Sequence, residues 1–177
     1  MMIDFSRNHY QLFELPERFE LDAAALEQAY RRAQSAIHPD RYAHAGETER
    51  RLALQLSAQV NEAYRTLKNP VARASYLLAL HHVDAFAESD TAMPAEFLLT
   101  QMQWREQLAD ALQERDAEAL DRLAGDVRAQ ASALDRGIAE LIDVRQAWDN
   151  ARSLVRQRKF LEKLATDISD ATAELDD

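Results

Sequence analysis

Apolar residues recur every three or four positions along most of the chain, which is the pattern of helices that bury one face. In the first half this pattern predicts a short helix over 8–15, two long helices over 23–37 and 47–67, and a fourth over 71–80. Asp22 is placed to cap the second helix, and Asn69 to cap the fourth with Pro70 at its first position. A short loop containing Pro39 joins the two long helices, so we expect them to lie antiparallel.

The second half predicts three further helices, which follow a polar, acidic linker. The first runs over 95–115, the second starts after Asp116, and the third starts near Asp143. At the start of the third helix, Asp143 and Gln146 have the spacing of a capping box. The predicted inner face of the middle helix comprises Leu123, Val127, Leu134, Ile138 and Leu141. The predicted core positions of the last helix recur every seven residues, at Ala147, Leu154, Leu161, Ile168 and Leu175. The predicted fold class is all-α, with a first domain over 1–81, a linker over 82–93 and a three-helix bundle over 94–177.

The composition supports long helices and excludes several classes of function. Hydrophobic residues make up 47% of the 177 residues, and only three glycines and four prolines interrupt them, whereas sandwiches and barrels need many turns. A net charge of −10 opposes binding to nucleic acid, whose phosphates attract clustered Lys and Arg. The absence of cysteine excludes thiol nucleophiles, disulfides and cysteine-held metals. No apolar run reaches the roughly 20 residues of a membrane span, and the first residues do not resemble a signal peptide, so a soluble cytoplasmic protein is expected.

The sequence shows no clear pattern of a catalytic, metal or cofactor site. His81, His82 and Asp84 are close in sequence, but adjacent residues diverge on a helix or turn and no third ligand is well spaced. A basic cluster on the last helix is interpreted as a solvated face or as partners for nearby carboxylates; it comprises Arg152, Arg156, Arg158, Lys159 and Lys163. The three glycines do not form a phosphate-binding loop, so we expect no ATP hydrolysis by this chain and no small-molecule substrate.

The loop between the two long helices contains the tripeptide His38-Pro39-Asp40. The segment AYRRAQSAI precedes it, Arg41 follows it, and NEAYRTLKNP closes the next helix. Together these segments resemble a J-domain. Two alternatives stay open: a loop in which the proline only turns the chain, and a histidine that acts as a base or metal ligand. The second lacks an accompanying nucleophile or carboxylate cluster.

The J-domain resemblance implies a co-chaperone that docks on a DnaK-type ATPase and stimulates its ATP hydrolysis. In that analogy Asp40 bonds a basic group of the chaperone, while His38 holds the loop and touches the partner. Pro39 stiffens the loop, so less entropy is lost on docking. Basic residues near the loop are expected to steer the encounter with an acidic chaperone surface, although exposed arginines are also typical of ordinary solvated faces. They are Arg31, Arg32 and Arg41.

The helix predicted over 95–115 carries two apolar faces, where a helix of a three-helix bundle needs one. Its core face comprises Phe97, Trp104, Leu108, Ala111 and Leu112. The second face comprises Leu98, Leu99 and Met102, with Gln103, Glu106 and Asp110 beside them. This second face either binds a partner protein or packs against the J-domain. Phe160 also lies off the core stripe of its helix, as either a second packing contact or an exposed anchor.

A more specific resemblance covers nearly the whole chain, from Asn8 to about Leu164. The segments NHYQLFELPERFELD, IHPDRYA, ASYLLAL, AEFLLTQMQWREQL and RKFLEKL, together with Trp148, are similar to the HscB family of iron–sulfur cluster assembly. The resemblance implies an N-terminal J-domain and a C-terminal three-helix bundle that meet in an L-shape. In this family the bundle binds IscU, the scaffold on which clusters are built. The protein delivers IscU to HscA, a DnaK-type chaperone, and stimulates its ATPase, and ATP turnover drives release of the cluster to acceptor proteins.

This resemblance implies a scaffold-binding set of Leu98, Leu99, Met102, Gln103, Glu106, Asp110 and Phe160, the off-core residues of the two helices. Thr100 and Gln103 stand where some relatives carry glutamate, which weakens the acidic part of the surface. The N-terminal cysteines that bind zinc in eukaryotic relatives are missing, which favours a bacterial type. Two rival functions remain: a general J-domain co-chaperone with a different client, and a helical structural protein with a degenerate tripeptide.

Overall fold

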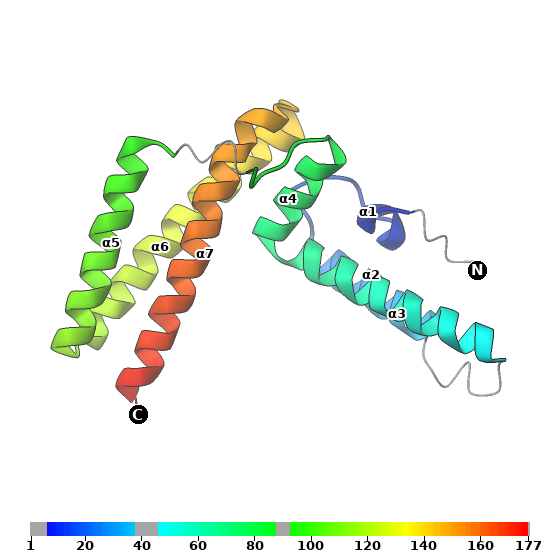
Figure 1. Ribbon diagram of the computed structural model, residues 1–177, viewed down its shortest axis with the longest axis horizontal. Helices are drawn as coiled ribbons and strands as arrows, with labels where there is room; N and C mark the ends of the chain where they lie inside the picture. The colour runs from blue at the N-terminus through cyan, green and yellow to red at the C-terminus, as the bar shows by residue number, and fades with distance from the viewer. Residues whose placement is uncertain (1–6, 38–45, 88–92, 177) are drawn as a thin grey trace. The chain divides into compact units, whose positions relative to one another are not determined.

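The computed structural model describes residues 7–37, 46–87 and 93–176, and every regular element within these ranges is helical (Figure 1). In chain order the elements are α1 (His9–Phe13), α2 (Ala23–Ala36), α3 (Glu47–Lys68), α4 (Pro70–Leu80), α5 (Ala95–Glu114), α6 (Ala117–Ala139), the π-helical turn η2 (Glu140–Val144) and α7 (Trp148–Asp176). The predicted all-α class is confirmed. Within the same ranges, no helix is both long enough and apolar enough to cross a bilayer.

The chain divides into two compact units, Met1–Leu77 and Leu78–Asp177. The division lies within α4, so the last turn of that helix belongs to the second unit. The predicted domain limits at 81 and 94 stay a prediction.

In the first unit, α2 and α3 run antiparallel (Figure 1). Each helix buries apolar residues at helical spacing, because one stripe per helix faces the core. The buried residues are Leu26 and Ala29 on α2, and Ala53, Leu56, Val60, Ala63 and Leu67 on α3. The rings of Tyr30 and Tyr64 stack across the two helices, with 4.0 Å between their centroids.

The helix starts of the first unit are fixed by short polar side chains. Asp22 accepts hydrogen bonds from the backbone N–H groups of Ala24, at 2.8 Å, and Ala25, at 3.3 Å. Asn69 accepts one from Ala72 at 2.8 Å, and Pro70 begins α4. These contacts satisfy donors that have no partner within the first turn of a helix. Both predicted caps are confirmed.

In the second unit, α5, α6 and α7 form a three-helix bundle (Figure 1). Its main core cluster comprises Phe97, Trp104, Leu123, Val127, Leu134, Leu161, Leu164 and Ile168. Gly137 allows α6 and α7 to approach closely, since a Cβ atom at this position would lie 3.0 Å from Leu154 Cδ1. A larger residue at this α6–α7 contact would require the Leu154 side chain to shift.

The junction between α6 and α7 differs from the prediction. Leu141 was expected on the inner face, but Ile142 is the buried residue and Leu141 is only partly buried. The cause is η2, which takes more residues per turn than an α-helix and so turns Leu141 further from the line of Ile138, while Ile142 stays on that line. The predicted helix start near Asp143 is also wrong, because this residue is still inside η2.

The predicted capping box of Asp143 and Gln146 is accordingly absent from this junction. Backbone bonds of 3.0 Å from Arg145 to Glu140 and of 2.8 Å from Ala147 to Leu141 close the π turn instead. Gln146 then adopts a φ of 52°, and α7 begins at Trp148. A local spacing rule could not detect a junction that is set by backbone bonds across the turn.

The predicted seven-residue stripe of α7 holds in part. Leu161 and Ile168 are buried, whereas Leu154 and Leu175 are partly buried at the edges of the core. Other positions complete the buried face: Ala151, Val155, Leu164 and Ala171. A strict seven-residue repeat drifts around a straight α-helix, so neighbouring positions take over the core contacts.

The segment just after α4, which includes the start of the predicted linker, packs against the bundle. Val83 and Ala85 are buried. The ring of His81 stacks on that of Trp148, with 3.6 Å between centroids, and Arg156 Nε donates to the carbonyl of Ala85 at 2.8 Å. Residues 81–87 are therefore anchored to α7 by both ends of the segment.

Candidate interaction surfaces

The structure describes two of the six predicted chaperone-binding residues. His38, Pro39, Asp40 and Arg41 lie outside the described residues, so their roles stay a prediction. Arg31 and Arg32 lie on α2 and are both exposed. The structure therefore describes the helix that leads into the loop.

Arg31 belongs to a polar network that connects α2 with α3. Its Nε lies 2.9 Å from Glu27 Oε1, one turn earlier on the same helix. Tyr64 of α3 donates its hydroxyl to Glu27 Oε2 at 2.5 Å. The hydrogen bond from Tyr64, followed by that from Arg31, lowers the pKa of Glu27 below its ordinary value. Glu27 thus stays ionised and holds the Arg31 side chain along α2.

A second polar contact joins the same two helices. Tyr30 donates its hydroxyl to Asn61 Oδ1 at 2.9 Å, and Gln34 Nε2 donates to the Tyr30 oxygen. Both networks lie beside the buried stripe and tie α2 to α3 through side chains. The exposed charges of α2 are therefore presented on a braced helix.

The two apolar faces predicted for α5 are separated in the structure. Phe97, Trp104 and Ala111 are buried in the bundle. The side chains of the other face are exposed: Leu98 by 46%, Leu99 by 62% and Met102 by 68%. We call the exposed residues Leu98, Leu99, Met102, Gln103, Glu106 and Asp110 the α5 face.

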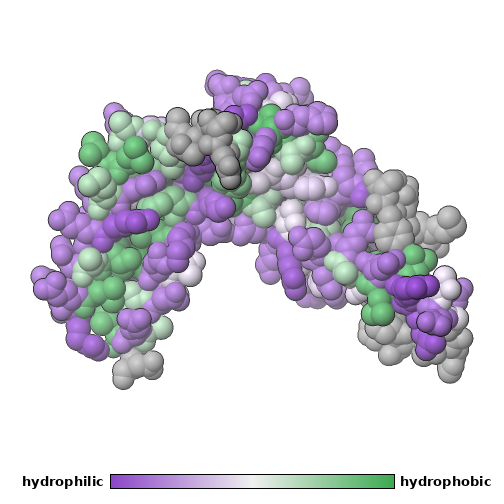
Figure 2. All heavy atoms as spheres, in the orientation of Figure 1, coloured by the Kyte–Doolittle hydropathy of each residue, from purple (hydrophilic) through white to green (hydrophobic). Residues whose placement is uncertain are grey.

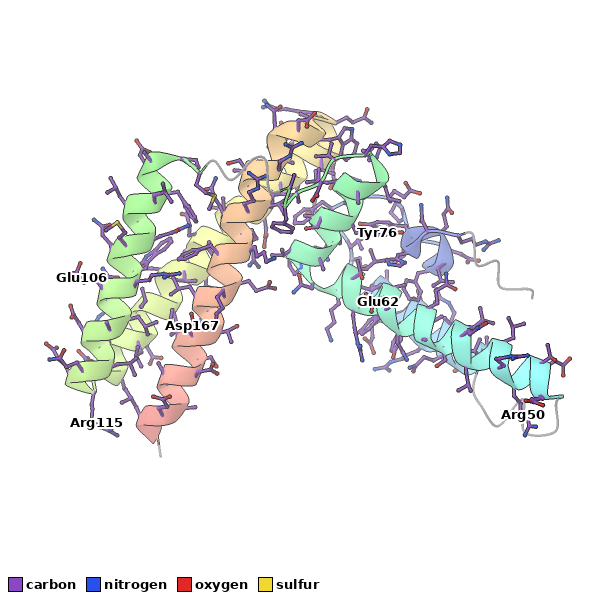
Figure 3. The ribbon with its side chains drawn as sticks, viewed as in Figure 1. Arg50, Glu62, Tyr76, Glu106, Arg115 and Asp167 are labelled. Atoms are coloured by element: carbon purple, nitrogen blue, oxygen red, sulfur yellow. The ribbon has the colours of Figure 1, made fainter. Side chains whose placement is uncertain are left out.

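The polar members of the α5 face lie beside its apolar part, towards the C-terminal end of the helix. Gln103, Glu106 and Asp110 are all exposed. Glu106 points away from the other two helices of the bundle (Figure 3). Hydrophobic residues reach the surface at several places over this unit (Figure 2). An apolar centre with charged residues beside it has the composition of a protein-binding surface.

Phe160 makes the second packing contact that its position off the core stripe allows, and it is also partly exposed. It is partly buried and packs against the bundle core, with its ring edge-on to that of Phe97 at a centroid distance of 5.9 Å and an angle of 84°. The remainder of the ring is accessible to solvent. Phe160 therefore rests on the core through Phe97 and exposes apolar surface next to α5.

Sequence reasoning did not single out Arg105, which contacts Phe160. The guanidinium carbon of Arg105 lies 5.4 Å from the centre of the Phe160 ring. Arg105 is spaced seven residues from Leu98 and three from Met102, so it lies on the same line of α5. This spacing was a usable signal, but the contact with α7 was not visible in the sequence.

The structure contains no evident site for a metal ion within its described residues. No group of three or more His, Asp or Glu side chains is placed to bind one there. The His81 ring of the candidate set is instead stacked on Trp148. In the basic cluster of α7, Arg158 Nε lies 2.9 Å from Asp135 Oδ1 and Arg152 Nη2 lies 2.9 Å from Asp149 Oδ1, so carboxylates do pair with it.

Two protein families match the two parts of the chain: the DnaJ domain over residues 8–76 and the HSCB C-terminal oligomerisation domain over residues 93–169. The co-chaperone protein HscB homolog of Ralstonia nicotianae is 47% identical to this chain, over 97% of the chain and 98% of that protein. The chain belongs to the HscB family. The HscB homolog of Cupriavidus taiwanensis is 46% identical over 95% of each protein.

Solved HscB structures share the fold. Chaperone HscB from Vibrio cholerae matches with a TM-score of 0.83 at 33% identity, covering 96% of this chain and 99% of that one. Human co-chaperone protein HscB matches with a TM-score of 0.87 at 25% identity, covering 94% of this chain and 83% of that one. The predicted combination of a J-domain with a C-terminal helical domain, and the predicted HscB family, are thereby confirmed.

Proposed function

We propose that this protein couples the iron–sulfur scaffold protein IscU to HscA, a DnaK-type chaperone. The C-terminal bundle binds IscU, and the J-domain brings IscU to HscA and stimulates its ATPase, which aids the maturation of iron–sulfur proteins. ATP is hydrolysed by the chaperone, so this chain acts as an adaptor with no catalytic residue or cofactor of its own. The observation that carries the proposal is the exposed apolar face of α5 in a chain of the HscB family.

On the bundle, the α5 face and Phe160 are the proposed contact with IscU. Leu98, Leu99 and Met102 would bury apolar area that is now in water, which is the main favourable contribution in most protein complexes. Binding energy concentrates in a few such residues, at about 2 kcal/mol or more each. Gln103, Glu106 and Asp110 would lie at the rim, where charges set the orientation of the partner.

On the J-domain, we assign the contact with HscA to His38, Pro39, Asp40, Arg31, Arg32 and Arg41. The assignment of Arg31 and Arg32 is supported by their exposure on a braced helix that leads into the loop. The roles of the loop residues rest on the J-domain resemblance and on the match of the DnaJ domain over residues 8–76.

Single-turnover ATP hydrolysis by HscA tests both halves together. Four mixtures are compared: HscA alone, with this protein, with IscU, and with both. We expect a stimulation by this protein that IscU increases synergistically. His38→Gln should abolish the stimulation, because the loop no longer engages the chaperone. The double variant Leu98→Ala with Phe160→Ala should keep the basal stimulation and lose the synergy.

Calorimetry then measures the affinity of the same variants for IscU. The double variant should bind at least about 30-fold more weakly, which corresponds to a loss of about 2 kcal/mol. Leu54→Ala is the matched control, because Leu54 is 67% exposed but lies on α3 of the other unit. Unchanged affinity of the double variant would disprove the assignment of the surface. Stimulation that is indifferent to IscU would indicate a different client, and no stimulation at all would disprove the adaptor function.

A further inference from the structure

Arg105 is the only Lys or Arg on α5, and it lies at the edge of the α5 face. The other charged residues of this helix are acidic: Glu96, Glu106, Asp110 and Glu114. Its contact with Phe160 places Arg105 on the side of the α5 face that is next to α7. A single positive charge among acidic and apolar residues is expected to make a specific contact.

That contact is the exposed part of the Phe160 ring. The guanidinium lies 5.4 Å from the ring centre, within the range of an attractive cation–π contact. The same ring meets Phe97 edge-on at 84°, and Phe97 in turn meets Trp104 edge-on at 80°. Phe160 is therefore held between a cation and an aromatic pair that belongs to the bundle core.

This arrangement affects how Phe160 binds a partner. A partly exposed phenylalanine can occupy several rotamers, and fixing one of them on binding costs conformational entropy. A cation beside the ring favours one orientation before the partner arrives. When a partner covers the site and excludes water, the cation–π contact becomes stronger than it is at an exposed position. Arginine suits such a site, because its guanidinium is more weakly hydrated than an ammonium group and is thus less costly to cover.

We propose that Arg105 is a positioning residue of the scaffold-binding surface and holds the Phe160 ring in the orientation that IscU binds. The inference rests on the proposed function, since it concerns the affinity for IscU. Arg105 acts through Phe160, so its contribution depends on the presence of the ring. This dependence distinguishes it from a charge that attracts IscU directly.

A double-mutant cycle measured by calorimetry with IscU tests this dependence. The four proteins are the wild type, Arg105→Gln, Phe160→Leu and the double variant. Phe160→Leu keeps an apolar side chain but removes the ring. Arg105→Gln should weaken binding about 3- to 30-fold in the wild-type background and less than about two-fold in the Phe160→Leu background. Arg122→Gln is the matched control, because Arg122 is exposed on α6 and its loss changes the net charge equally.

The position of the ring has its own readout, which needs no partner. Aromatic NMR resonances of Phe160, assigned by their absence from Phe160→Leu, should shift in Arg105→Gln and return part of the way in Arg105→Lys. Lysine restores a cation but not the planar, weakly hydrated guanidinium, so the expected order of affinity is Arg, then Lys, then Gln. Arg122→Gln should leave these resonances unchanged.

Four outcomes would overturn the proposal. Equal losses in both backgrounds would mean that Arg105 contacts IscU itself, and unchanged Phe160 resonances in Arg105→Gln would mean that it does not hold the ring. If wild type and Arg105→Gln bind IscU equally, the positioning role is wrong while the proposed function stands. If the wild type does not bind IscU, the proposed function is wrong and the inference falls with it.

Discussion

The exposed surfaces of α2 and α5 differ in what they offer a partner. On α2 the exposed groups include two charged side chains, Arg31 and Arg32, and Arg31 is already hydrogen-bonded to Glu27, which Tyr64 holds in turn. On α5 the exposed groups include Leu98, Leu99 and Met102, which no core residue covers. A charged surface can steer a short-lived encounter, whereas apolar burial holds a partner in place. The two units are thus suited to the two different tasks of the proposed adaptor.

The strongest test of this division is to unfold one unit and leave the other intact. All five tyrosines lie in the first unit and both tryptophans in the second, so near-ultraviolet tyrosine signals and tryptophan fluorescence report on the units separately. Leu67→Ala removes a fully buried side chain of α3 and should destabilise the first unit by about 2–5 kcal/mol. In urea unfolding, the tyrosine midpoint should fall while the tryptophan midpoint and the IscU affinity stay unchanged.

If both midpoints fall together in Leu67→Ala, the two units unfold as one and the comparison loses its basis. Leu54→Ala is the control for this measurement, because it shortens an exposed leucine of the same helix. It should leave both midpoints where they are.

Salt should weaken the contact with HscA more than the contact with IscU, and this effect should be smaller than that of Leu67→Ala. Raising the salt from about 50 mM to about 300 mM screens exposed charges, so HscA stimulation at low protein concentration should fall while IscU affinity changes by less than about two-fold. Replacing Arg31 and Arg32 together by glutamine should mimic the effect, with an apparent HscA affinity about 5- to 10-fold weaker at low salt.

The control for these charges is the pair Arg128→Gln and Arg136→Gln. Both residues are exposed on α6 of the other unit. Replacing them removes the same total charge as replacing Arg31 and Arg32. If this pair reduces the stimulation as much as the α2 pair, the effect comes from net charge and α2 is not a specific contact.

The smallest expected effect is a pH dependence confined to the first unit. Burial, with its ring stacked on that of Tyr76, lowers the pKa of His9 below 6.5, and Glu62 only partly opposes the shift. The unfolded chain therefore binds a proton at higher pH than the folded chain, and stability falls as the pH drops below about 6.5. Glu27 does not contribute to this change, because its pKa lies below its ordinary value of 4.5.

His9→Phe keeps a ring to stack on Tyr76 but cannot be protonated. Between about pH 7.5 and about pH 5.5, its tyrosine-detected urea midpoint should fall less than that of the wild type. Equal losses in the two proteins would assign the pH dependence to other groups. The tryptophan-detected midpoint provides the internal reference.

Local signals accounted for most of what the sequence predicted correctly. Asp22 and Asn69 cap helices because a short polar side chain bonds to the backbone two or three residues away, and such contacts need no tertiary information. The two faces of α5 followed from helical spacing alone. Ile142 and Arg105 were missed for the opposite reason. The burial of Ile142 depends on a π turn formed by the packed junction, and the contact of Arg105 depends on a ring that belongs to another helix.

The anchored segment 81–87 has a consequence for proteolysis and for cutting the protein into parts. A protease needs a stretch of chain that leaves the surface, and Val83 and Ala85 are buried. A bundle fragment that begins near residue 93 would lose this segment and expose the Trp148 ring on which His81 stacks. A fragment that begins at residue 78 is longer but keeps these contacts, so it is the piece that we expect to stay folded on its own.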